Sequence, residues 1–100
     1  MPNDIFANTR EQTQPHISTL VPRILPQGKR VGNEWVALNP TRHDRKVGSF
    51  KINLNNGRWS DFATGDSGGD LISLAGYLYC MSPKEAAKYV CSIAGVANDL

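Results

Sequence analysis

The middle of the chain alternates between apolar and polar residues, and a helical period replaces this alternation toward the C-terminus. The segment 49–54 places three residues on one side of an extended strand: Phe50, Ile52 and Leu54. Asn56-Gly57 follows, a dipeptide that tolerates the two positive φ values of a type I′ turn, and the next extended segment covers 58–62. The pattern predicts a β-hairpin.

Two amphipathic helices are predicted after this hairpin. A glycine-rich segment at 63–69 leads into the first helix, which begins near Asp70. Its apolar stripe has helical spacing: Leu71, Leu74, Ala75 and Leu78. The second helix begins at the capping box Ser82-Pro83-Lys84-Glu85, with proline at the first helical position, and Gly95 is expected to end it.

The first part of the chain has a weaker pattern. Residues 1–15 are polar and contain two prolines, so we expect a flexible lead-in before a single domain over 16–100. The segment 16–25 has helical spacing interrupted by Pro22, which predicts a short or kinked helix, and 34–38 reads as a strand. The predicted fold class is therefore α+β, a small antiparallel β-sheet packed against two C-terminal helices.

Composition indicates an ordinary soluble domain. The chain has 100 residues, of which 40% are hydrophobic and 20% charged, with a net charge of +2. No apolar run approaches the ~20 residues that span a bilayer, and the first residues lack a signal peptide. Two cysteines eleven residues apart form no disulfide framework. We expect a cytoplasmic protein without a membrane partner.

The charges are distributed unevenly. Between Arg23 and Arg58, eight cations stand against two anions, a local balance of +6, whereas the rest of the chain carries −4. Four aromatic residues lie in or beside this basic segment: Trp35, Phe50, Trp59 and Phe62. Proteins that hold single strands combine cations along the phosphates with rings that stack on bases. The alternatives are a solvated basic face and rings that belong to the core.

Carboxylates allow a second kind of site. Asp61, Asp66 and Asp70 could share a divalent cation in a small nuclease. Alternatively, Asp70 caps a helix and the other two are solvated. The histidines and cysteines lack zinc-site spacing. The residues alone therefore predict no bound metal, no cofactor and no catalytic group.

Two longer motifs resemble a known family. Residues 25–44 read L-P-x-G-K-R-x-G-N-E-W-V-A-x-N-P-T-R-x-D, and residues 48–74 read G-S-F-x-I-N-L-x-x-G-x-W-x-D-F-A-T-G-D-x-G-G-D-L-I-S-L. The stretch 25–90 resembles the N-terminal domain of DNA primase and primase-helicase proteins of phages, plasmids and integrated elements. More distantly, it is similar to the zinc-ribbon domain of bacterial primases. The block 57–74 is the most specific part.

The resemblance has a consequence for metal binding. In the bacterial primase domain a Cys, a His and two further Cys hold zinc, and the resemblance places these ligands at Pro40, His43, Asp61 and Thr64. Only His43 is a residue of the ligand type. The resemblance therefore implies a ribbon-like domain without zinc, in which packing or hydrogen bonds replace the metal.

The resemblance implies an accessory, non-catalytic domain that binds single-stranded template DNA in replication. Its partners would be a primase catalytic domain or a replicative helicase. The charge and hairpin patterns supply the candidate phosphate contacts: Lys29, Arg30, Arg42, Arg45, Lys46, Lys51 and Arg58. Trp59 is the candidate stacking residue. The alternative is a protein-interaction module that docks on a primase or helicase and does not bind DNA.

Overall fold

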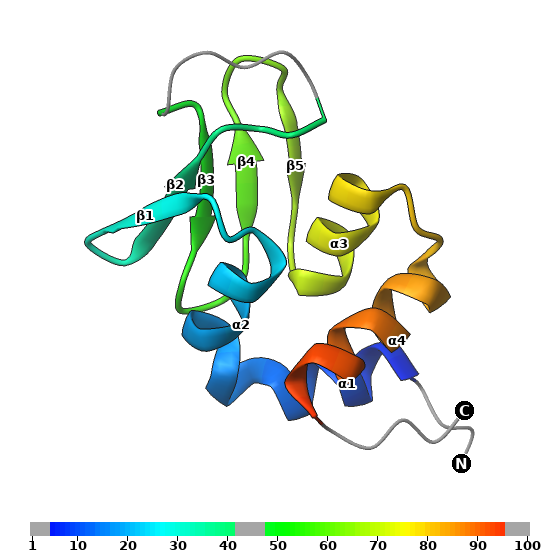
Figure 1. Cartoon of the computed structure of the whole chain (residues 1–100). Coiled ribbons are helices and arrows are strands. Elements are labelled where there is room, and N and C mark those ends of the chain that lie inside the picture. Colours follow the sequence, from blue (N-terminus) through cyan, green and yellow to red (C-terminus); the bar gives the residue numbers. More distant parts are fainter. Residues whose placement is uncertain (1–4, 42–47, 96–100) are drawn as a thin grey trace.

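A five-stranded antiparallel sheet and a group of helices make up the chain, as the computed structural model shows for residues 5–41 and 48–95 (Figure 1). The strands are β1 (Gly28–Val31), β2 (Glu34–Ala37), β3 (Phe50–Asn53), β4 (Trp59–Asp61) and β5 (Asp66–Gly68). The helices are α1 (Ile5–Thr13), the short 3-10 helix η1 (Gln14–His16), α2 (Ile17–Ile24), α3 (Leu71–Tyr79) and α4 (Pro83–Ala94). The predicted α+β class is confirmed.

The sheet is a meander in which every strand pairs with its neighbour in sequence, in the order β1-β2-β3-β4-β5. The strand register places Ala37 opposite Phe50 and Ile52 opposite Trp59, and all four side chains are buried. Side chains alternate along each strand, so the intervening residues lie on the opposite side of the sheet. We call the two sides the helix-covered face and the open face.

The predicted hairpin is present, but the predicted turn type is wrong. β3 and β4 are joined through residues 54–58, in which the Gly57 amide donates to the Asn53 carbonyl and the Asn53 amide donates to the Arg58 carbonyl. A type I′ turn needs positive φ at both central residues. Here Gly57 has φ of +76°, and Asn56 is not among the residues with positive φ. The connection is therefore longer than the two-residue turn predicted.

The sequence pattern predicts no helix in residues 1–15, where the structure has α1. This helix packs on α4, and its Phe6 side chain packs against the hydrophobic core. Thr9 and Thr13 are buried, and the Thr9 hydroxyl lies 3.3 Å from the Cys91 sulfur. Helical periodicity of apolar residues could not identify α1, because two of its buried positions are threonines. No helix in 5–41 or 48–95 is long and apolar enough to cross a membrane.

The predicted helix ends are confirmed. Asp70 caps α3 by accepting a 2.8 Å hydrogen bond from the Ser73 amide. Ser82 and Glu85 form the capping box of α4, in which the Glu85 amide donates to the Ser82 hydroxyl oxygen and the Ser82 amide donates to Glu85 Oε1. The bond from the Ser82 amide is the main cause that holds the pKa of the Glu85 carboxyl below its usual value. Gly95 ends α4 in the left-handed conformation.

Two glycines with similar backbone angles give a test of packing at the β3–β4 connection. Gly57 and Gly32 have φ of +76° and +61°, so alanine at either position carries similar backbone strain, about 1–2 kcal/mol. An added Cβ at position 57 would lie 3.3 Å from a Leu71 methyl group, whereas nothing lies within 4 Å at position 32. Gly57→Ala should therefore lower the free energy of unfolding by about 1 kcal/mol more than Gly32→Ala, measured by urea denaturation. An equal or larger loss at position 32 would contradict this packing.

Candidate nucleic-acid interface

The open face carries a row of side chains that crosses the whole sheet and is polar except at Val36. Cross-strand pairing joins one residue from each strand in this row: Lys29, Val36, Lys51, Ser60 and Ser67. Val36 lies between the two lysines and is buried. Directly opposed residues in a sheet have Cβ atoms about 5 Å apart, so the row forms one continuous strip.

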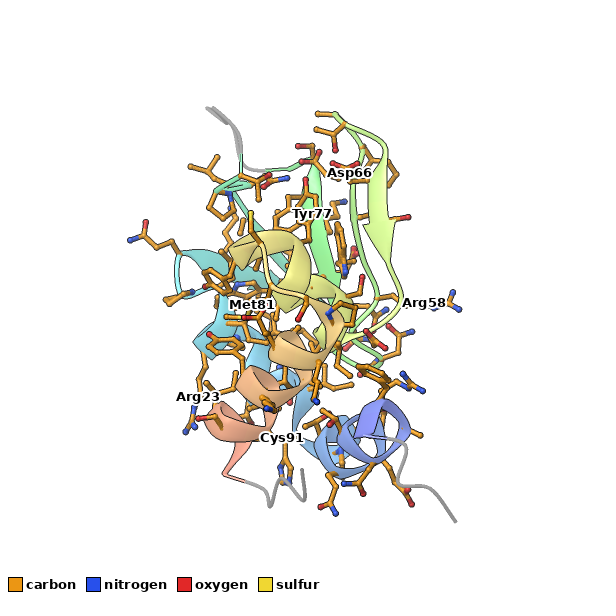
Figure 2. All side chains as sticks on the ribbon, turned by 90° about the vertical axis from the view of Figure 1, so that its right-hand side faces the viewer. Arg23, Arg58, Asp66, Tyr77, Met81 and Cys91 are labelled. Carbon is orange, nitrogen blue, oxygen red and sulfur yellow. The ribbon has the colours of Figure 1, made fainter. Side chains whose placement is uncertain are left out.

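A hollow of about 590 Å³ lies on the same face. Residues of β2 to β5 and of the connections beside them line it: Glu34, Lys51, Asn53, Arg58, Trp59, Ser60, Ser67, Gly68 and Gly69. Arg58 is exposed and points away from the body of the protein (Figure 2). The hollow thus combines two cations and two hydroxyl groups with one carboxylate, a set that suits a phosphate and sugar backbone.

The structure brings three of the sequence-predicted phosphate contacts to this face and separates a fourth. Lys29, Lys51 and Arg58 belong to the open face. Arg30 pairs with Trp35 in the register of the other face, and its Nε donates to the Gly32 carbonyl at 2.9 Å. The remaining candidates lie outside the described residues: Arg42, Arg45 and Lys46.

Trp59 lies inside the protein. Its side chain is 5% exposed, and its ring centroid lies 4.5 Å from that of Tyr77 and 6.0 Å from that of Phe50. In the described part of the chain, the indole Nε1 has no hydrogen-bond partner, so packing holds the ring. The structure therefore does not give Trp59 the exposed ring that base stacking requires. Trp35 is also partly buried, and its Nε1 donates to the Leu25 carbonyl.

Phe62 is an exposed aromatic residue near Lys51 and Arg58 of the open face. Its side chain is 76% exposed, immediately after β4. Phe62 is one of the four aromatic residues in or beside the basic segment, but the sequence-based prediction of a stacking residue falls on Trp59 instead. The alternation along the hairpin predicts that Phe62 lies on the same face as Lys51, because Phe62 is in phase with Ser60 on β4, and Ser60 pairs with Lys51.

A polar network ties together the loops at one end of the strands. Asn39 is buried after β2, and its Nδ2 donates to the buried Asp61 Oδ2 and to the Tyr77 hydroxyl oxygen, both at 2.8 Å. The Tyr77 hydroxyl donates to Asp66 on β5 at 2.9 Å, and these two side chains meet in Figure 2. Thr41 donates twice to Asn39 Oδ1. The network links β2, β4, β5 and α3.

This network occupies positions at which the family resemblance places zinc ligands. Pro40 has no side-chain donor atom. Asp61 already accepts hydrogen bonds at both carboxylate oxygens, from Asn39 and from the Ala63 amide, and the Thr64 hydroxyl accepts one from the Asp66 amide. His43 lies outside the described residues. The described residues therefore do not fit a structural zinc ion, which needs four closely placed N, S or O ligands.

The three aspartates considered for a nuclease site have separate structural roles. Asp61 belongs to the buried network, and Asp66 accepts from Tyr77. Asp70 caps α3 and forms a 3.4 Å ion pair with Arg10. Across 5–41 and 48–95, no three His, Cys, Asp or Glu side chains are grouped to hold a metal ion.

No protein-family model and no curated protein matches the chain. Its fold is similar to the crystal structure of the Aquifex aeolicus primase, described as its zinc binding and RNA polymerase domains, with a TM-score of 0.76 and 23% sequence identity. The match covers 99% of this chain and 23% of that primase chain. The chain therefore shares the fold of part of that primase chain and spans less than a quarter of its length.

Asp61→Asn tests the buried network. An amide at position 61 keeps one acceptor but turns an NH2 group toward either Asn39 Nδ2 or the Ala63 amide, so two donors face each other. We expect the free energy of unfolding to fall by about 1–3 kcal/mol in urea denaturation. Asp66→Asn is the control, because its exposed amide can still accept from Tyr77, and it should change stability little.

Metal removal gives a second test of the same loops. The purified chain should contain no stoichiometric zinc by elemental analysis, and excess EDTA should leave its thermal unfolding midpoint unchanged, because hydrogen bonds hold the loops. Unfolding by EDTA, reversed by added zinc, would show that other residues complete a metal site.

Proposed function

We propose that the chain is a zinc-free, non-catalytic domain of a DNA primase or primase-helicase from a phage, plasmid or other mobile element, and that it binds single-stranded template DNA in the cytoplasm. The observation that carries the proposal is the convergence of Lys29, Lys51 and Arg58 on the open face of a primase-related fold. Among the described residues, Glu34 is the one carboxylate that lines the hollow on this face.

The shape of the face favours a single strand over a duplex. A row that crosses five antiparallel strands forms a shallow surface along which an extended phosphate backbone can lie. Recognition of duplex DNA commonly inserts a helix or β-ribbon into the major groove. Arg42, Arg45 and Lys46, in the chain between β2 and β3, are proposed to add phosphate contacts to this strip.

The domain is proposed to hold the template for a separate catalytic domain. The catalytic carboxylates of the primase family belong to another domain, and in this chain Asp61, Asp66 and Asp70 serve the fold, as a cap or as hydrogen-bond acceptors. The proposed partners are single-stranded DNA and a primase catalytic domain or a replicative helicase.

Charge reversal on the open face tests this function. Lys51→Glu with Arg58→Glu should weaken binding of a labelled single strand at least tenfold at 50 mM salt, measured by fluorescence anisotropy. Each phosphate contact contributes about −0.7 to the log-log salt slope, so the three cations of the open face account for about −2 of the wild-type slope, and the double variant should flatten the slope by roughly 1.4. Duplex DNA should bind the wild type more weakly.

The matched control is Lys84→Glu with Lys88→Glu, which makes the same change in net charge at exposed positions of α4. This variant should bind nearly as well as the wild type. Equal losses in both double variants would mean that net charge, and not the open face, attracts DNA. Absence of binding by the wild type, together with direct binding of a purified primase or helicase, would favour the protein-interaction alternative.

A further inference from the structure

Phe62 stands out among the apolar side chains that the structure describes. It is 76% exposed, compared with 54% for Val31, 44% for Tyr79 and 39% for Leu38. Exposing a whole phenyl ring to water is unfavourable, and the hydrophobic core does not include this ring. Such a ring beside cations is an arrangement by which proteins hold unpaired bases.

The hydrogen bonding of the hairpin places the ring on the open face. The Phe62 amide donates to the Ser49 carbonyl at 3.0 Å, so the β3–β4 ladder continues one residue beyond β4. Phe62 therefore follows Arg58 and Ser60 in the same alternation. At about 3.3 Å per residue, Phe62 and Arg58 lie roughly 13 Å apart along the strand, the length of about four stacked nucleotides.

The backbone on the C-terminal side of Phe62 is held in place. The buried Asp61 carboxylate accepts from the Ala63 amide at 2.8 Å, and the Asp61 carbonyl accepts from the Gly65 amide at 2.8 Å. With the ladder bond at Ser49, these contacts fix the backbone on both sides of the ring. A fixed aromatic platform loses little conformational freedom when a base stacks on it.

We propose that Phe62 stacks on a base of the bound single strand, while Lys51 and Arg58 contact the phosphates on one side of that base. This inference rests on the proposed function and assigns to Phe62 the stacking role that the buried Trp59 is not placed to perform. It predicts that part of the affinity depends on the presence of bases, independent of their sequence, because every base has a stacking face.

The test combines a protein variant with a DNA change. Wild type and Phe62→Ala are titrated with a labelled thymidine oligonucleotide and with an abasic oligonucleotide of equal length. Phe62→Ala should weaken binding of the thymidine strand about 5- to 100-fold and leave binding of the abasic strand nearly unchanged. Val31→Ala, another exposed apolar position in register with the open face, should leave both affinities unchanged.

A spectroscopic variant gives an independent readout. Phe62→Trp should retain binding, and its added exposed indole should be quenched by the thymidine strand but not by the abasic strand. The native tryptophans are 5% exposed at Trp59 and partly buried at Trp35, so they should contribute little to this change. Circular dichroism should show that each variant keeps the wild-type fold, because the replaced side chain is mostly outside the core.

Each outcome decides the inference. Equal thymidine binding by wild type and Phe62→Ala, with Lys51→Glu and Arg58→Glu still impaired, would overturn the stacking role and leave the proposed function standing. Equal losses on both oligonucleotides would assign Phe62 to the protein structure and also overturn it. A wild type that binds neither strand would overturn the inference together with the proposed function.

Discussion

The buried carboxylate of Asp61 is the constraint on which the candidate interface depends. It accepts hydrogen bonds from the Asn39 amide group and from the Ala63 backbone, which joins the chain after β2 to the turn between β4 and β5. A buried carboxylate is costly unless its oxygens are satisfied, so this position tolerates few rearrangements. The side chain thereby fixes which residues of β4 point inward.

The direction of Asp61 determines the character of both sides of the sheet. With Trp59 and Asp61 pointing toward the helices, Ser60 must point to the open face, and Phe62 continues that alternation beyond the strand. The aromatic cluster of Phe50, Trp59 and Tyr77 fills the helix-covered face. The division between core and candidate binding surface therefore follows from the orientation of one short strand.

Sequence reasoning succeeded where a physical signal was strong and local. Phe50 and Ile52 have the period of a half-buried strand, and Ser82 with Glu85 forms a capping box that needs no tertiary context. It failed for α1, whose contact with α4 uses threonine. It also singled out Trp59 as the stacking residue and could not foresee that its ring packs against Tyr77, a residue eighteen positions away on another element.

The contact of α1 with α4 joins residues that lie far apart in sequence, such as Thr9 and Cys91, whereas each strand of the meander pairs with its immediate neighbour. Pairing of sequence neighbours has a low entropic cost of loop closure, and contacts across eighty residues have a higher one. The sheet can therefore form early as the chain is synthesised. The helical layer is completed only when α4 has emerged, so α1 must wait for its partner during translation.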